Sequence, residues 1–291
     1  MFSASDVKAL RDKTGAGMMD CKKALQESNG NMEDAVTWLR EKGISKAAKK
    51  ASRIAAEGLS DYLCEGNKIV LVELNCETDF VAKNEEFKAL VKNVLKAIVN
   101  SDVKTIEEAN ELKLESGDTI GEAITAFTAK IGEKISFRRF EVISKTDDQT
   151  FGVYSHMSGK ITVVVVLDGA NNDVGKDVAM HVCAMKPTYI SSDEIPLDVL
   201  EKEKTIYKEQ AINDGKPADI AEKMVMGRIN KFYKEVCLND QEFFKEPGMS
   251  VSKYVSNNGG SIVKMIRYEV GEGIEKRQDN FAEEVKNQIN G

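Results

Sequence analysis

One stretch of the sequence has the residue types of a phosphate-binding loop. Gly169, Gly175 and Lys176 lie between an apolar run and an amphipathic segment, as they would where a strand leads into a helix. The motif requires four residues between its glycines, and this segment has five. It also requires Ser or Thr after the lysine to bind Mg²⁺, whereas Asp177 would direct a carboxylate at the phosphate. We therefore interpret the segment as a turn that leads into a helix.

The histidines and cysteines offer a second kind of chemistry, a thiol nucleophile activated by an imidazole. His156 and His181 are the two histidines, and on paper either of them pairs with Cys64, Cys76 or Cys183. However, His181 and Cys183 are two residues apart on a predicted helix and point to different faces. Buried structural cysteines are the favoured interpretation, and no catalytic or metal-binding residue is assigned.

Residues 78–83 (TDFVAK) put a carboxylate beside an aromatic side chain, shortly after an apolar run. In one interpretation Asp79 caps the following helix and Phe80 packs into the core, and the residue types alone favour it. In the other, a loop tip presents Phe80 to a partner protein, since aromatic side chains that become buried anchor interfaces. The sequence leaves both interpretations open.

The overall composition predicts a folded chain of two or three compact units, since 291 residues exceed a typical domain of ~100–200. The net charge of −7 argues against a general nucleic-acid binder. Five cysteines without a Cys-x-x-Cys pair argue against a disulfide framework or a zinc site, and they favour a reducing cytoplasm. The longest apolar run, residues 161–167, is far shorter than the ~20 residues of a membrane span. The start, MFSASDVKAL, predicts no signal peptide.

The first 54 residues form a distinct basic segment. They carry 11 Lys and Arg residues against 7 Asp and Glu residues, although the whole chain is acidic. Three short helical patterns, separated by glycine-containing breaks, predict a three-helix module over residues 1–54. Its basic residues offer a surface for RNA, although a solvated helix face explains such charges more often. These residues are Lys22, Lys23, Lys46, Lys49, Lys50 and Arg53.

From residue 55 onward the pattern predicts an α+β core. A β-branched strand at residues 68–74 precedes a helix that Asn84 caps, and residues 134–142 predict another strand. The second half repeats this plan with a strand, a helix and a final strand, whose sequence MIRYEV echoes FRRFEV of the first half. We assign residues 55–147 to the first subdomain and residues 148–190 and 238–272 to the second.

The second copy is about 36 residues longer than the first, as its equivalent strands show. The surplus falls in residues 191–237, where two helical patterns flank the sequence NDGKP. This predicts an antiparallel helical hairpin inserted in the second subdomain. Long paired helices leave apolar surface uncovered, so we expect the hairpin to contact a second molecule, which would make a homodimer if that molecule is another copy of the chain.

Four blocks of the sequence resemble the translation elongation factor Ts family. The most diagnostic is residues 75–83 (NCETDFVAK), and residues 14–25 (TGAGMMDCKKAL) resemble the amino-terminal signature of the family. Residues 179–182 (AMHV) and 267–276 (RYEVGEGIEK) also agree, in the same order along the chain. The resemblance implies a ubiquitin-associated-like module, two α+β subdomains, an inserted coiled-coil hairpin and a carboxy-terminal helical module over residues 273–291.

The resemblance also implies a guanine-nucleotide exchange factor that binds elongation factor Tu and needs no cofactor. Asp79 and Phe80 would intrude beside the switch region of the GTPase and disturb its Mg²⁺ and phosphate contacts. The amino-terminal module would pack near the guanine-binding side, and the second subdomain would bind a different domain of the partner. The matching residues are Thr78, Asp79, Phe80, Val81 and Lys83; Met18, Met19, Lys22 and Lys23 in the module; and His156, Phe243 and Phe244 in the second subdomain.

A distributed mechanism follows from the size of these effects. Weakening GDP binding a thousandfold requires ~4 kcal/mol of coupling, whereas burying one Phe supplies only ~1.5–3 kcal/mol. No bond is made or broken, so no catalytic residue is needed. The competing interpretations are an RNA- or ribosome-binding protein that uses the basic first 54 residues, and a small thiol enzyme. We expect a cytoplasmic protein without membrane contact or stable nucleic-acid binding.

Overall fold

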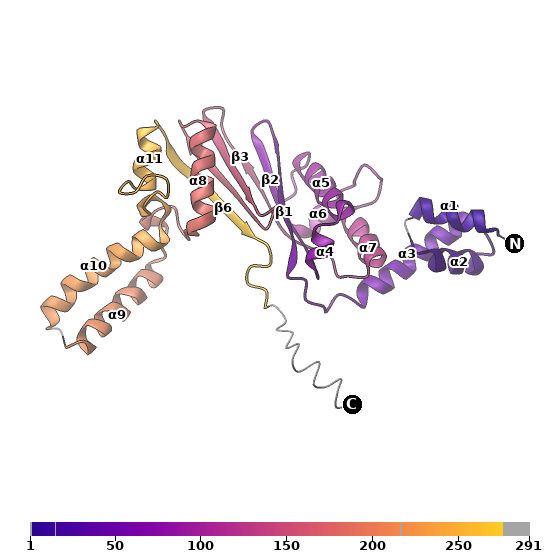
Figure 1. Ribbon diagram of the computed structural model, residues 1–291, viewed down its shortest axis with the longest axis horizontal. Helices are drawn as coiled ribbons and strands as arrows, with labels where there is room; N and C mark the ends of the chain where they lie inside the picture. Colours follow the sequence, from indigo (N-terminus) through magenta and orange to yellow (C-terminus); the bar gives the residue numbers. More distant parts are fainter. Residues whose placement is uncertain (1, 15, 216, 276–291) are drawn as a thin grey trace. The chain divides into compact units, whose positions relative to one another are not determined.

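The structure is a computed structural model that describes residues 2–14, 16–215 and 217–275. Its helices and two three-stranded sheets confirm the predicted α+β class (Figure 1). The described residues form two compact units. Ile143–Tyr268 make up unit 2, and the residues before and after them make up unit 1. The predicted carboxy-terminal helix lies outside the described residues.

Three helices at the start of unit 1 surround a small core of their own. They are α1 (Ala4–Thr14), α2 (Met18–Glu27) and α3 (Met32–Ala48). Asn31 begins α3, because its side-chain oxygen accepts hydrogen bonds from the N–H groups of Glu33 and Asp34. The core between these helices consists of Val7, Leu10, Cys21, Ala24, Leu25 and Ala35.

The sheet of unit 1 has the order β1 (Glu57–Glu65), β2 (Lys68–Cys76) and β3 (Ser136–Ser144). β1 and β2 form an antiparallel hairpin that closes at the pair Glu65 and Lys68. β2 is buried along almost its whole length, as its β-branched sequence predicts. β1 is not evident in the sequence, because polar residues interrupt its apolar positions.

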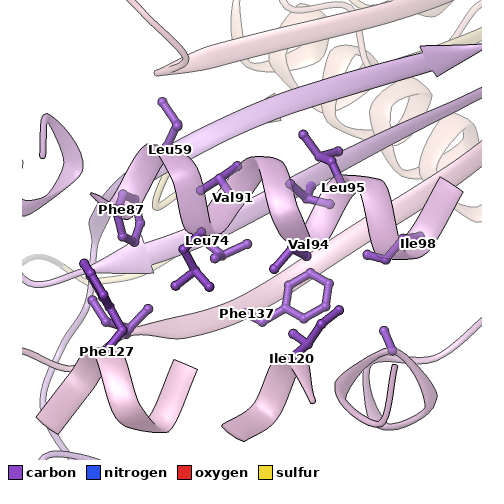
Figure 2. Packing of buried hydrophobic residues seen from close by; sticks show 14 of the residues in the cluster. Leu59, Leu74, Phe87, Val91, Val94, Leu95, Ile98, Ile120, Phe127 and Phe137 are labelled. Carbon is purple, nitrogen blue, oxygen red and sulfur yellow. The ribbon is translucent and has the colours of Figure 1, made fainter. Parts of the chain in front are cut away.

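Helices complete the core of unit 1. They are α4 (Asp79–Ala82), α5 (Glu85–Val99), α6 (Ile106–Asn110) and α7 (Ile120–Ile131). Figure 2 shows the buried side chains of α5 together with Leu74 of β2 and with Ile120 and Phe127 of α7. The predicted apolar stripe of α5 is confirmed. Its members Phe87, Leu90, Val91, Val94 and Ile98 are all buried.

A buried carboxylate fixes the last described residues to this sheet. Glu73 is fully buried and accepts hydrogen bonds from Arg138 Nη1 (3.0 Å) and Arg139 Nε (2.6 Å). It also accepts one from the N–H group of Gly271 (2.9 Å). Gly271 has a φ of +76°, and a Cβ atom there would lie 2.1 Å from the carbonyl oxygen of Ala56. Only glycine fits this position.

Unit 2 is built on a second sheet, with the order β4 (Gln149–His156), β5 (Ile161–Asp168) and β6 (Ser261–Glu269). The helix α8 (Asn172–Met185) packs on β4 and β5, and α11 (Val251–Asn257) adds to the same core. Asn171 caps α8 by accepting a hydrogen bond from the N–H group of Val174 (3.0 Å). This confirms that residues 169–177 form a turn into a helix.

Two helices project from this unit between α8 and α11. They are α9 (Leu197–Asn213) and α10 (Ala218–Val236), which pack along one another as the predicted hairpin does (Figure 1). The buried residues between them include Ala211, Ala221, Val225 and Ile229. At the base of the pair, the N–H groups of Thr188 and Tyr189 both donate to the carbonyl oxygen of Val236. The base is therefore closed by its own hydrogen bonds.

Candidate functional site

The helix α4, which follows β2, is fixed at its N-terminal end. Thr78 is the N-cap of α4, and its hydroxyl accepts a hydrogen bond from the N–H group of Val81. The same hydroxyl donates to Glu133 Oε1 (2.7 Å), and the N–H group of Thr78 donates to Glu133 Oε2 (3.0 Å). One carboxylate therefore fixes both the backbone and the side chain at the start of α4.

A second glutamate makes the reciprocal contact. Glu77 Oε1 accepts a hydrogen bond from the N–H group of Lys134 (2.6 Å), and Glu77 Oε2 pairs with Arg53 Nη1 at 3.1 Å. Lys134 Nζ in turn donates to the carbonyl oxygen of Arg53. We call the paired contacts of residues 77–78 and 133–134 the glutamate clasp. Sequence analysis missed it, because its partners lie 55 and 57 positions apart and leave no local pattern.

α4 buries one face and exposes the other. Val81 and Ala82 are buried in the core of unit 1, whereas Phe80 is 81% exposed. At 3.6 residues per turn, Phe80 lies about 150° around the helix from the middle of the buried face. The helix therefore cannot bury Phe80 while Val81 and Ala82 remain in the core.

The interpretation that the residue types favour is therefore wrong for both residues of the pair. Phe80 is not a core residue. Asp79 does not cap the following helix, because Asn84 caps α5 by accepting from the N–H group of Glu86 (2.7 Å). Asp79 instead forms an ion pair with Lys83 at 2.6 Å, one turn along the chain. The element that presents Phe80 is the short helix Asp79–Ala82 and not a loop tip.

The predicted contact residues of the amino-terminal helices lie on the exposed side of α2. Met19 is 74% exposed, Met18 is also exposed, and Lys22 and Lys23 are exposed with them. The opposite side of the helix provides Cys21, Ala24 and Leu25 to the core. Unit 1 thus presents two methionines and two lysines on one short helix.

In unit 2 the end of β4 carries His156. Its Nδ1 atom lies 3.0 Å from the hydroxyl of Tyr154, and the two ring centroids are 5.8 Å apart. In the antiparallel pairing of β4 and β5, His156 stands opposite Ile161 at the last pair before the turn. The strand pair and Tyr154 together fix the imidazole.

The loop after α10 separates the two predicted phenylalanines. Phe243 is 1% exposed and stacks on Tyr254 with ring centroids 4.0 Å apart, whereas Phe244 is 42% exposed. His181 Nδ1 accepts a hydrogen bond from the N–H group of Phe244 (3.4 Å). His181 Nε2 lies 3.0 Å from Gln241 Oε1. Phe244 is therefore the accessible member of the pair, and Phe243 positions it from the core.

The cysteines differ in exposure. All five cysteines lie in the described residues and none is in a disulfide. Four are buried, and Cys64 is exposed, which corrects its assignment as a buried residue. Burial raises the pKa of the Cys237 thiol to about 11, so it stays protonated at neutral pH. Within residues 2–14, 16–215 and 217–275, no group of three or more His, Cys, Asp or Glu side chains could hold a metal ion.

None of the helices that the structure describes is long and apolar enough to cross a membrane.

A comparison with known protein families covers most of the residues discussed above. The sequence profile of the family described as Elongation factor TS matches residues 77–272. The match begins next to Thr78 and includes His156 and the loop of Phe244. This family has a nucleotide-exchange role in translation elongation. With more than half of its length matched, the chain belongs to the elongation factor Ts family.

Proposed function

We propose that this protein promotes GDP release from elongation factor Tu by inserting Phe80 into an apolar gap beside the switch region of the GTPase. The observation that carries the proposal is an exposed phenylalanine on a helix that the glutamate clasp holds in place. An aromatic side chain that is fixed before binding loses little conformational freedom when a partner buries it. Its burial then supplies about 1.5–3 kcal/mol.

Phe80 alone is too small for the expected effect. A thousandfold weakening of GDP requires about 4 kcal/mol, so further contacts must contribute. The exposed methionines and lysines of α2 supply one such surface in unit 1, and His156 and Phe244 each supply an accessible contact in unit 2. Asp79 and Lys83, already paired with each other, would bring a carboxylate and an ammonium group to the edge of the Mg²⁺ site of the partner.

Exchange by this route makes and breaks no covalent bond. The protein would bind the nucleotide-free GTPase more tightly than the GDP-bound form, and GDP would weaken its own binding by the same factor. No side chain needs a shifted pKa or a nucleophilic role. The proposal includes residues 1–54 as a ubiquitin-associated-like module and the helical pair of residues 191–237 as a coiled coil, in a cytoplasmic protein.

Release of labelled GDP from elongation factor Tu tests the proposal. The wild-type protein should accelerate release, and Phe80→Ala should lose at least about tenfold of that acceleration, as expected for one buried aromatic contact. Its thermal unfolding should be unchanged, because an 81% exposed side chain contributes little to the fold.

Leu197→Ala is the matched control, since it truncates an apolar side chain that is 79% exposed on α9. It should leave GDP release unchanged. A Phe80→Ala protein that melts several degrees lower would identify Phe80 as a core residue. Full acceleration by Phe80→Ala would remove it from the mechanism.

A further inference from the structure

The turn between β4 and β5 has a backbone conformation that L-amino acids rarely adopt. Met157, Ser158 and Gly159 have φ values of +49°, +54° and +89°. The N–H groups of Gly159 and Lys160 both donate to the carbonyl oxygen of His156, at 3.2 Å and 3.1 Å. The three residues therefore form a tight turn in which every φ is positive.

Two of these three residues are poorly suited to that conformation. In a left-handed turn the Cβ atom approaches the following carbonyl oxygen, so Gly is preferred and Asn or Asp is tolerated. The structure describes two other non-glycine residues with positive φ: Asn29, an amide residue, and Lys186, which ends α8 as a C-cap. Among the described residues, Met157 and Ser158 alone are consecutive.

The packing of unit 2 does not explain a methionine at this position. Met157 is 70% exposed, so most of its apolar surface stays in water. Gly at position 157 or 158, or Asn in place of Met157, would adopt a positive φ with less strain. A strained, exposed apolar residue therefore contributes little to the fold, and such strain is found most often at functional positions.

The turn lies next to His156, a predicted contact of the partner. His156 immediately precedes Met157 and is fixed by the hydroxyl of Tyr154. β5, on the other side of the turn, is buried along its length and packs under α8. The exposed methionine thus lies beside His156 at the end of the strand pair and enlarges the accessible surface there. A methionine suits such a role, because its flexible thioether adapts to an irregular apolar pocket.

We propose that Met157 is an apolar anchor of unit 2 that enters a pocket on elongation factor Tu beside the contact of His156. The strained turn is retained because it holds this side chain exposed at the end of the strand pair. This inference rests on the proposed function, whose partner it shares. It adds a contact residue that the sequence motifs do not include and that lies in a different unit from Phe80.

Three variants distinguish the effect of backbone strain on stability from the effect of the Met157 side chain on binding. Ser158→Gly relieves one left-handed residue and keeps Met157, so the thermal midpoint should rise by about 2–4 °C, with unchanged affinity for nucleotide-free elongation factor Tu. Met157→Asn keeps a tolerated left-handed residue and removes the apolar side chain. It should raise the midpoint as well, while the affinity measured by calorimetry falls at least about tenfold. The double variant should be the most stable and should bind as weakly as Met157→Asn.

The outcomes are distinguishable from failure of the proposed function. If Phe80→Ala loses exchange while Met157→Asn binds as tightly as the wild type, the anchor is overturned and the proposed function stands. If the wild type itself fails to accelerate GDP release, both are overturned. A lower thermal midpoint for Met157→Asn would make Met157 a structural residue. A change in self-association by sedimentation, with unchanged partner affinity, would identify a second copy of the chain as the occupant. Either result contradicts the proposal.

Discussion

At the scale of single residues, hydrogen bonds at both ring nitrogens fix the tautomer of His181. Its Nδ1 atom accepts a hydrogen bond from the N–H group of Phe244, so the proton of the neutral ring resides on Nε2. The Nε2–H group then donates a hydrogen bond to Gln241 Oε1. The ring also contacts the side chains of Phe243 and Phe244. A second proton on the ring would remove the acceptor that holds the backbone of Phe244.

This predicts a pH-dependent stability of unit 2. Burial lowers the pKa of His181 below its usual value of 6.5. The unfolded chain then takes up the proton at a higher pH than the folded chain does. The free energy of unfolding should therefore be highest above about pH 6.5 and fall as the pH falls toward the lowered pKa.

Urea unfolding of the wild type and of His181→Gln between about pH 5 and 7.5 measures the effect. The variant should lose the part of the pH dependence that belongs to the imidazole. A nuclear magnetic resonance titration that gives His181 a pKa at or above 6.5 would contradict the prediction, and it does not depend on the variant folding.

The exposure of Phe80 shows what residue types cannot decide. An aromatic residue after an apolar strand is more often buried than exposed. Its actual position depends on the orientation of a helix of only four residues, and this orientation is set by Val81, Ala82 and the distant Glu133. The residue type of Phe80 does not contain that information, because part of it comes from Glu133, which is distant in the sequence. The family resemblance therefore implied an accessible Phe80, whereas the residue types favoured a buried one.

Among the structural elements, α4 depends on the glutamate clasp. Glu133→Ala would leave the N–H and hydroxyl groups of Thr78 without this carboxylate partner. We expect a loss of about 1–2 kcal/mol of stability, typical of hydrogen bonds to a partly exposed charged group. Stimulated GDP release should fall as well, although Phe80 itself is unchanged.

Glu115→Ala is the control for this prediction. It removes a glutamate of the same unit that pairs with Lys96 on the surface, and such pairs contribute little. Both variants are assayed by thermal unfolding and by GDP release. If Glu133→Ala exchanges as fast as the wild type, α4 does not need the clasp to present Phe80.

The helical pair α9–α10 should be removable as an element. The hydrogen bonds of Thr188 and Tyr189 with Val236, the last residue of α10, close its base, and all three residues lie outside the segment to be removed. Replacing residues 197–234 by a short Gly-Ser linker should therefore leave a cooperatively folded unit 2, with GDP release partly retained.

Self-association should decrease in the same deletion, because Ile212, Ile220 and Met226 expose apolar surface on these helices. Sedimentation of both proteins at matched concentration measures this. Unchanged association would move the contact elsewhere, and complete loss of exchange by a well-folded deletion would show that the helices shape the surface for the partner.

Elements with a strong local pattern could be predicted, and elements defined by distant contacts could not. The stripes of α5 and α8 repeat with helical period, so both helices were expected. β1 and β4 mix polar and apolar residues and become strands only through pairing with β2 and β5. α6 and α7 carry a recognisable signal, since Thr105 and Thr119 each precede a glutamate by three residues and form capping boxes.

On the scale of the whole molecule, the residues proposed to bind the partner belong to both compact units. The sequence repeat predicted two related halves. It did not predict that the last described residues, from Glu269 onward, return to unit 1. That return depends on Glu73 and Gly271, which are 198 positions apart and carry no shared pattern.

Gly271→Ala should therefore destabilise unit 1 strongly. A Cβ atom there meets the carbonyl oxygen of Ala56 at 2.1 Å and also requires a left-handed conformation. Gly273→Ala is the matched control, because Gly273 has a similar φ of +75° and no atom within 4 Å of its Cβ position. We expect Gly271→Ala to lower the thermal midpoint well below that of Gly273→Ala. Equal midpoints would mean that the close approach is not formed in solution.

The contact of Glu73 with Gly271 also sets an order of assembly during synthesis. A ribosome that adds ~5–20 residues per second needs roughly 10–40 s to travel the 198 positions between them. Arg138 and Arg139 are synthesised 65 and 66 positions after Glu73, early in that interval. For the rest of it, Glu73 has its arginine partners but not the N–H group of Gly271. Unit 2 is one continuous stretch and leaves the ribosome before Gly271 does. The part of the protein that is made first is therefore the part that is completed last.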